Sequence, residues 1–252
     1  YWGTPITLFV NKNSGELHPE TESLFEVVAK KIELEGIEAW FKLKVEDILG
    51  DEASDYEKTT DTLDVWFDSG VSHYAVLKAS DYLSDVADMY LEGSDQHRGW
   101  FQSSLLTSCA INGRAPYKQV LTHGFTVVQN GHKMSKSVGN VVPPQKVVNS
   151  LGADILRLWI GSTDYSGEMT VSDEILNRSA DSYRRIRNTM RFMLANMEGF
   201  DPSKDLVDID HMLVLDKWIV SKTAELQKNV IREYDEYNFH FAMKAILNFC
   251  TN

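Results

Sequence analysis

Long apolar runs and paired cysteines are both missing from this sequence of 252 residues. No window approaches the roughly eighteen consecutive apolar residues that a membrane-spanning helix needs, so such a helix is excluded. The two cysteines, Cys109 and Cys250, lie far apart and outside any Cys-x-x-Cys pair, which argues against a disulfide scaffold and a zinc ribbon. We therefore expect a protein of a reducing compartment, the cytoplasm, that uses neither a membrane nor zinc in this segment.

An initiator methionine and a targeting leader are also missing. The chain begins with Tyr1-Trp2-Gly3 and shows no signal or transit peptide. It stops at Thr251-Asn252, within a stretch whose pattern is still helical. Hydrophobic residues make up 43% of the sequence and charged residues 25%, which suits one or two globular domains and argues against disorder. We expect the sequence to be a globular piece of a longer protein.

The net charge of −12 argues against a nucleic-acid partner when it is averaged over the chain, yet the charge is unevenly distributed. Residues 1–92 carry −13, residues 93–200 carry +4 and residues 201–252 carry −3. A basic segment in the middle of the chain indicates an anion that is bound locally. We interpret most acidic residues before position 92 as the solvated faces of helices.

Strands and helices are predicted to alternate through the first two thirds of the chain. Alternating apolar residues predict a half-buried strand at Leu63–Asp68 with Trp66 on its polar side. Helical spacing predicts a helix at Glu20–Leu34 that Gly36 closes. The other predicted elements are a strand or extended entry at Trp2–Val10, a connection at Asp47–Glu57, strands at Ala87–Leu91 and Gln119–His123, helices at Gln96–Ile111, Pro144–Asn149 and Ala153–Ile160, and a hairpin turn at Asn130-Gly131. This alternation favours an α/β fold with a parallel sheet whose strand-end loops carry the site.

The last third of the chain is predicted to be all-helical. Ser172, followed by two acidic residues, predicts a helix start, and Gly199 predicts its end. Residues at heptad spacing form one packing seam along this helix, namely Leu176, Ser179, Tyr183, Ile186, Met190, Met193 and Met197. We interpret the methionines of the seam as core filler. Two further helices are predicted at Asp216–Tyr234 and from Phe239 to the end.

The most specific string in the sequence is Lys133–Ser137, which reads KMSKS. A chance match of these five letters has odds on the order of one in ten thousand for a chain of ordinary composition. Two lysines with one serine between them and another directly after them, in a loop beside Gly139, suit the binding of phosphate. A solvated basic turn is the alternative for any two loop lysines, and the complete string argues against it.

This string matches the second signature of the class I aminoacyl-tRNA synthetases letter for letter. The segment Leu91–Phe101, which reads LEGSDQHRGWF, is similar in particular to the isoleucyl members of bacterial or organellar type. Four further segments resemble the same family, namely Tyr1–Ile6, Asp64–Gly70, Leu121–Phe125 and Gly152–Trp159. The likeness covers nearly the whole chain and is weaker only in Glu35–Thr60 and after Asp201.

The resemblance implies the C-terminal half of a Rossmann-type parallel-sheet nucleotide-binding domain followed by an all-helical segment. It assigns residues 1–165 to the second half of the catalytic domain, residues 166–205 to a helical stem-contact region, and residues 206–252 to the start of a helical anticodon-binding domain. The family's first signature, of the His-x-Gly-His type, and the cysteine zinc site of many members are not found in the sequence. We therefore expect this chain alone to be inactive. We also expect the longer protein to be a monomer. A sheet without its partner half exposes an apolar edge, so the piece is expected to self-associate.

The implied activity is the ATP-dependent activation of isoleucine to its adenylate, followed by transfer to tRNA(Ile). Isoleucine, tRNA(Ile) and ATP with Mg²⁺ are the implied substrates. By match to the signature, Lys136 contacts the ATP phosphates in the transition state and Lys133 supports it. The residues implied to hold the ribose or amino group of the adenylate are Glu92, Gly93, Asp95 and Gln96. A plain helix N-cap is the alternative role for Ser94 or Asp95.

Trp66 and Trp100 are the candidates for the wall of the isoleucine pocket. A flat apolar surface suits a branched aliphatic group, although it separates isoleucine from valine by only about 1–3 kcal/mol. A core position is the alternative for each tryptophan. His123, at a strand end before Gly124, is a candidate for the ATP site, with a structural histidine as the alternative.

Five arginines lie off the seam of the long predicted helix, namely Arg178, Arg184, Arg185, Arg187 and Arg191. Phosphate contacts position a nucleic acid without reading its sequence, so arginines on one helix suit the tRNA backbone. We predict such a contact for Arg184, Arg187 and Arg191. A solvated basic face is the alternative.

Three other functions stay open on the sequence. A valyl or leucyl enzyme is the nearest, and the segment Asp95–Trp100 argues against it. A non-catalytic RNA-binding relative would keep the fold, and the intact loop around Lys136 argues against it. An unrelated nucleotidyltransferase with a mobile lysine loop would depend on ATP and be indifferent to isoleucine.

Overall fold

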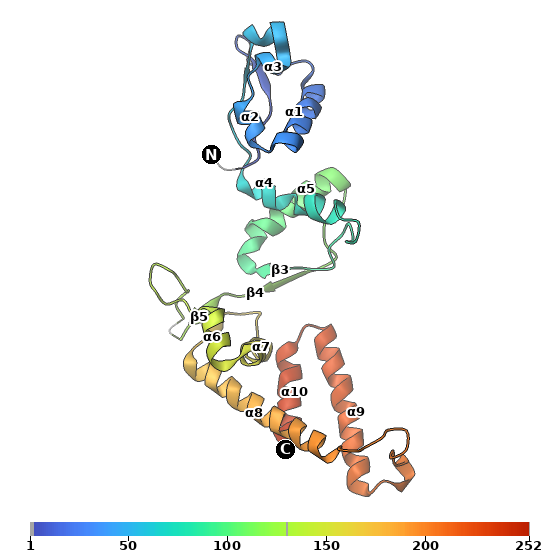
Figure 1. The fold of residues 1–252 in the computed structure, drawn as a ribbon. Helices are drawn as coiled ribbons and strands as arrows, with labels where there is room; N and C mark the ends of the chain where they lie inside the picture. Colours follow the sequence, from blue (N-terminus) through green and yellow to red (C-terminus); the bar gives the residue numbers. More distant parts are fainter. Residues whose placement is uncertain (1–2, 130, 252) are drawn as a thin grey trace. The chain divides into compact units, whose positions relative to one another are not determined.

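The computed structural model describes residues 3–129 and 131–251, so Trp2 of the predicted extended entry and Asn130 of the predicted turn lie outside the described residues. The chain divides into two compact units, an N-terminal unit up to Leu121 and a C-terminal unit from Thr122 onward. Figure 1 traces the elements of each unit in chain order. None of the helices within the described ranges combines the length and apolar character that a bilayer crossing needs.

The N-terminal unit begins with a small α/β cluster around Trp40. Strand β1 (Phe9–Asn11) pairs antiparallel with β2 (Tyr56–Lys58), and Phe9 lies opposite Lys58. The helical segments around them are α1 (Thr21–Glu35), α2 (Glu38–Lys42), α3 (Glu46–Leu49) and a 3₁₀ helix, η1 (Gly50–Ser54). Their buried residues form one cluster, made of Phe9, Leu24, Val28, Trp40 and Leu43. The predicted helix that Gly36 closes is confirmed as α1, and Gly36 has a φ of 82°.

Two predictions for the N-terminal unit are wrong in detail, and a third is a regular strand only at its end. Leu63–Asp68 is not a strand, because Val65–Gly70 forms helix α4, whose start is capped by Asp64 accepting from the Trp66 N–H at 2.8 Å. The segment predicted as a connection contains α3, η1 and β2. The predicted strand or extended entry is a strand only at its end, since β1 begins at Phe9.

The second part of this unit joins strand β3 to helix α5. β3 (Tyr90–Gly93) pairs with β4 (Val120–His123), along which the N-terminal unit ends, and Ala87 forms a parallel bridge with Tyr117. The predicted helix from Gln96 is interrupted at Gly99, so a 3₁₀ helix, η3 (Ser94–Arg98), precedes α5 (Trp100–Asn112). Helix α4 and a π-helix, η2 (His73–Lys78), pack against α5.

His73 makes the stability of the N-terminal unit depend on pH. Its ring is 2% exposed and its Nε2 lies 3.1 Å from Thr107 Oγ1, and burial lowers the pKa of His73 below its ordinary value of 6.5. Below pH 6.5 His73 therefore binds a proton more readily in the unfolded chain than in the folded unit. The free energy of unfolding consequently falls as the pH falls. The decrease ends below the pKa of the folded state, and its slope is at most about 1.4 kcal/mol per pH unit.

We expect urea unfolding of the chain, followed by tryptophan fluorescence, to show this loss between pH 7.5 and pH 5. His73→Gln keeps a polar partner for Thr107 and does not titrate, so its midpoint is expected to change less over the same range. Equal pH dependence in the two proteins would contradict the assignment to His73.

The C-terminal unit is built on one parallel strand pair. β5 (Thr126–Val128) pairs in parallel with β6 (Met169–Val171), with Thr126 opposite Met169. This confirms parallel pairing here, although β6 is not predicted from the sequence. Helices α6 (Pro144–Leu151) and α7 (Ala153–Ser162) lie where they are predicted. The buried cluster beneath them consists of Val147, Trp159, Met169, Val171 and Leu176.

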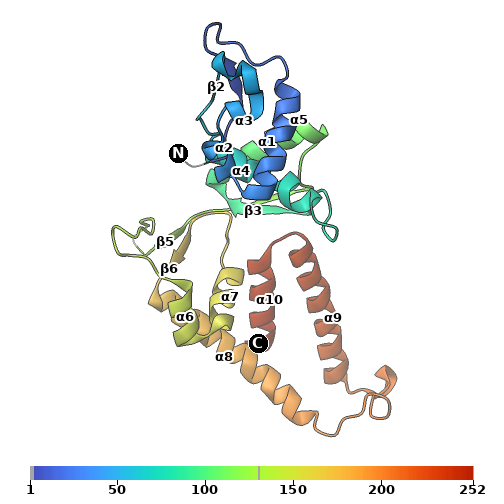
Figure 2. The same ribbon diagram turned by 45° about the horizontal axis from the view of Figure 1, so that its top comes forward.

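The rest of the C-terminal unit is helical, as predicted. It contains α8 (Asp173–Asn196), a 3₁₀ turn η4 (Ile209–His211), α9 (Val214–Asp235) and α10 (Phe239–Thr251). Ser172 caps α8 by accepting from the Ile175 N–H at 3.3 Å. α10 packs against α7, α8 and α9 (Figure 2). The interpretation of the methionine seam is wrong, because Leu176 is 2% exposed whereas Met190, Met193 and Met197 are about half exposed. The apolar spacing continues beyond the part of α8 whose seam is buried.

Candidate functional site

The end of β3 presents two carboxylates and one amide that is already engaged. Glu92 and Asp95 are exposed, while Gly93 between them is buried. The Gln96 side chain accepts from the Trp100 N–H at 2.9 Å and donates to Asp95 Oδ2 at 3.2 Å. The Gln96 side chain therefore provides the acceptor for a backbone N–H in the first turn of α5. The alternative in which Ser94 or Asp95 caps that helix is wrong.

The two candidate pocket tryptophans both lie next to Gly99. The Trp100 ring stacks on Tyr90 with centroids 4.1 Å apart, and its Nε1 donates to the Ser69 carbonyl at 3.1 Å. The Trp66 side chain comes from α4 and is 50% exposed. A Cβ added at Gly99 would lie 2.9 Å from the Trp66 ring and 2.7 Å from Gln96 Oε1. Neither tryptophan is a fully buried core residue, and the structure brings both together with Gln96.

A loop between β5 and α6 carries the two signature lysines. Asn140 closes this loop, since its Oδ1 accepts from the Ser135 N–H at 2.8 Å and its Nδ2 donates to the Lys133 carbonyl at 3.2 Å. Met134 packs against the buried cluster of the C-terminal unit. The predicted hairpin is reduced to one antiparallel bridge, between Val127 and Lys133.

The two lysines of the loop differ in their surroundings. The Lys133 ammonium lies over the Phe125 ring, 3.8 Å from its centroid, which is a cation–π contact. Lys136 is exposed, and among the described residues its side chain has no hydrogen bond or ion pair. Lys136 is thus the lysine that the loop offers to an anion.

His123 lies at the end of β4 and is half-buried. Its Nδ1 donates to the Gly124 carbonyl at 2.8 Å, which fixes the tautomer and leaves Nε2 as an acceptor. The next residue is held closely, because the Gly124 N–H donates to the Tyr165 carbonyl at 2.8 Å and a Cβ there would lie 2.0 Å from the Gly167 oxygen. Both the structural and the ligand-binding roles of His123 are compatible with this geometry.

The arginines of α8 are exposed and partly paired. Arg178 pairs with Glu174 at 2.5 Å and Arg184 with Asp181 at 2.9 Å. Arg187 and Arg191 lie on the exposed surface without an ion pair to any residue that the structure describes. These two side chains keep their full charge for an external anion.

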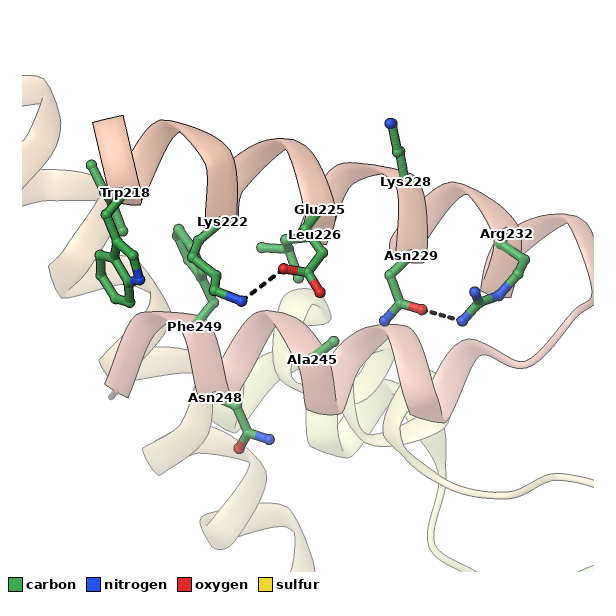
Figure 3. A pocket seen from close by; sticks show the side chains of 11 residues that line it. Trp218, Lys222, Glu225, Leu226, Lys228, Asn229, Arg232, Ala245, Asn248 and Phe249 are labelled. Carbon is green, nitrogen blue, oxygen red and sulfur yellow. Dashed lines mark hydrogen bonds and ion pairs between the residues drawn. The ribbon is translucent and has the colours of Figure 1, made fainter. Parts of the chain in front are cut away.

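A groove of about 910 Å³ lies between α9 and α10 in the C-terminal unit (Figure 3). Trp218, Leu226 and Phe249 give it apolar walls. Lys222 pairs with Glu225 at 2.8 Å across its lining, and Arg232 donates to Asn229. The charges that line the groove are thus already partnered in part.

Three residues that belong to the lysine loop or contact it are not predicted as functional, namely Phe125, Met134 and Asn140. The string Gly139-Asn140 directly after the signature is typical of a turn, and it could have pointed to Asn140. Within residues 3–129 and 131–251, no group of three or more His, Cys, Asp or Glu side chains is placed to hold a metal ion.

Comparison with known proteins defines the class. Residues 1–172 match the model of the tRNA synthetases class I (I, L, M and V), and residues 216–252 match the anticodon-binding domain of tRNA ligase. The first match covers well over half of the chain, so this chain belongs to the class I tRNA synthetases. The fold prediction is confirmed, and the unrelated nucleotidyltransferase is wrong as an alternative.

The curated relatives point to one member of that family. The chain is 68% identical over 252 residues to the isoleucine–tRNA ligase of Ruthia magnifica subsp. Calyptogena magnifica, covering 100% of this chain and 27% of that protein. It is 63% identical over 249 residues to the isoleucine–tRNA ligase of Saccharophagus degradans, covering 99% of this chain and 27% of that protein. The chain thus spans about a quarter of the length of these relatives.

Solved structures of lower identity share the fold. The ternary complex of Agrobacterium radiobacter K84 agnB2 LeuRS, tRNA and LeuAMS superposes with a TM-score of 0.70 at 19% identity, covering 99% of this chain and 35% of that chain. Methionyl-tRNA synthetase of Mycobacterium tuberculosis, in complex with methionyl-adenylate, gives a TM-score of 0.55 at 22% identity and covers 79% of this chain and 40% of that chain.

Proposed function

We propose that these residues are part of an isoleucine–tRNA ligase, which activates isoleucine with ATP and transfers it to tRNA(Ile). The observation that carries the proposal is the closed signature loop, with Lys136 exposed and unpaired among the described residues. The identity of 68% to an isoleucine–tRNA ligase supports the choice of amino acid.

In the proposed reaction the isoleucine carboxylate attacks the α-phosphorus of ATP, which enters as its Mg²⁺ complex. A carboxylate–phosphorus bond forms, the bond to the bridging oxygen breaks, and pyrophosphate leaves with the electron pair. Negative charge grows on the leaving phosphates, and the ammonium of Lys136 stabilises it. Lys133 supports this role from its position over Phe125. His123 Nε2, as an acceptor, can bind a ribose hydroxyl or the adenine amino group of ATP.

The strand-end residues are proposed to hold the nucleoside part of the adenylate. Glu92 and Asp95 are exposed carboxylates that can accept from ribose hydroxyls or from the amino group of isoleucine. Gly93 is buried and has no side chain, so the adenylate can come close to its backbone. Gln96 fixes the turn through its bond to the Trp100 N–H. Trp66 and Trp100 are proposed to wall the isoleucine side chain.

The helical part is proposed to bind tRNA. Arg187 and Arg191 are exposed without an ion pair to described residues, whereas Arg184 shares its charge with Asp181. We keep the division at 1–165, 166–205 and 206–252 for the catalytic part, the stem-contact region and the start of the anticodon-binding domain. The family matches to residues 1–172 and 216–252 support this division.

Pyrophosphate exchange by the full-length protein that contains this chain tests the proposal. Exchange that depends on isoleucine supports it, whereas a clear preference for valine or leucine would show a valyl or leucyl enzyme. Salt-dependent tRNA binding without exchange would show a non-catalytic RNA-binding relative. The 252-residue chain alone is expected to show no exchange near the full-length rate, because the His-x-Gly-His string is not among its residues.

Gly99→Ala is expected to weaken isoleucine binding. The new Cβ would lie 2.9 Å from the Trp66 ring, so the wall of the proposed pocket has to move. We expect the KM for isoleucine in exchange to rise about tenfold, the effect of a methylene-sized misfit, while the KM for ATP changes little. Gly161→Ala, whose Cβ meets only Met243 Cγ at 3.6 Å, is the matched control. An unchanged KM for isoleucine in Gly99→Ala would show that Trp66 does not form a wall of the isoleucine pocket.

A further inference from the structure

The side chain of Asn140 closes the lysine loop from within. It accepts from the Ser135 N–H at 2.8 Å and donates to the Lys133 carbonyl at 3.2 Å. Neither of these backbone groups belongs to a helix or strand, so the amide supplies partners that regular structure does not. One side chain thereby fixes the backbone on the N-terminal side of Lys136.

The loop is fixed on its C-terminal side as well. Gly139 has a φ of 72°, and its N–H points back to the carbonyls of Ser135 and Lys136, at 3.1 and 3.3 Å. Met134 and Val142 both pack against the buried cluster of the C-terminal unit. The backbone of Lys136 is therefore held on both sides while its side chain stays exposed.

We propose that Asn140 is a positioning residue for Lys136. It does not need to touch ATP, because it acts by keeping the loop closed, so that the lysine is placed before the substrate arrives. A loop without these two bonds would have to be ordered again in every turnover, and that cost lowers the rate of the chemical step. The inference rests on the proposed function and extends it to a residue outside the five-letter signature.

Exchange kinetics of the full-length protein test this role. Two lost hydrogen bonds correspond to roughly a tenfold to thirtyfold shift toward the open loop. Asn140→Ala is thus expected to lower kcat about tenfold and to leave the KM for isoleucine within twofold. Asn140→Asp keeps the acceptor for the Ser135 N–H and loses the donor, so its kcat is expected to lie in between. Asn149→Ala, which removes an exposed asparagine of α6 bonded to Gln145, is the matched control and is expected to be unchanged.

Limited trypsin digestion gives a readout that does not depend on activity. Trypsin cuts after Lys133 and Lys136, and cleavage requires an open loop, so Asn140→Ala is expected to be cut there about tenfold faster than the unaltered protein and Asn149→Ala at the same rate. A fall in kcat without faster cleavage, or faster cleavage without a fall in kcat, overturns the proposal. If the unaltered protein shows no isoleucine-dependent pyrophosphate exchange, the proposed function fails. Equal cleavage rates of Asn140→Ala and the unaltered protein would overturn the role of Asn140 separately.

Discussion

Lys136→Ala is expected to lower kcat for isoleucine-dependent pyrophosphate exchange by about 10²–10³-fold in the full-length protein, the loss seen when one preorganised charge-stabilising group is removed. The lysine is exposed, and its ammonium is not committed to any described partner, so its charge is available for the leaving phosphates. The KM for isoleucine is expected to stay within about threefold, because the interaction is made in the transition state.

Two lysine controls sharpen this expectation. Lys133→Ala is expected to have a smaller effect, because the Lys133 ammonium already lies 3.8 Å from the Phe125 ring centroid. Lys146→Ala removes an exposed lysine of α6 outside the loop and is expected to leave exchange unchanged. Equal decreases of kcat in Lys136→Ala and Lys146→Ala would show that the loop acts only through its general positive charge.

Local chemistry predicted the helices whose ends carry clear signals. Gly36 ends α1 and Ser172 caps α8, because one backbone angle or one side-chain bond decides each end. The same kind of signal was missed at Asp64. Its cap on the Trp66 N–H starts a helix in a segment whose apolar alternation is typical of a strand. The cap at Asp64 and the packing of α4 against α5 together favour a helix over the strand that the pattern predicts.

Contacts between distant residues account for what the sequence did not predict. β6 is only three residues long and forms because it pairs with β5. Its own residues are too few to show a pattern that predicts a strand. The exposed Met190 shows that a seam indicates which face of a helix is apolar, but not where the neighbouring helices stop covering it.

The candidate site was predicted by its letters more than by its geometry. The string Lys133–Ser137 located the loop, and the segment Leu91–Phe101 located the strand end. The role of Asn140 was not predicted from the sequence, because it depends on a turn that brings position 140 back to positions 133 and 135. The engagement of Gln96 with the start of α5 escaped for a similar reason, since it depends on the break at Gly99.

Trp40→Ala is expected to destabilise the N-terminal unit by about 3–5 kcal/mol, the cost of truncating a large aromatic side chain in a core. Trp40 is 1% exposed and packs edge-to-face on Phe9, with ring centroids 5.5 Å apart. Its Nε1 donates to the Thr59 carbonyl at 3.1 Å, so truncation also leaves a half-buried carbonyl without that partner.

The Trp40 indole also lies under a lysine that holds α2 in place. The Lys58 ammonium, 5.3 Å from the Trp40 ring centroid, donates to the carbonyls of Trp40 and Leu43, both at 2.6 Å, and burial lowers the pKa of Lys58. Loss of the ring therefore admits water to these bonds and loosens the end of α2 as well as the cluster. Urea unfolding of Trp40→Ala should show an early transition of the N-terminal unit, while Tyr82→Ala, at a residue 88% exposed in the same unit, should unfold as the unaltered chain does. A loss below about 1 kcal/mol would mean that the N-terminal unit does not depend on this cluster, contrary to the burial of Trp40 at its centre.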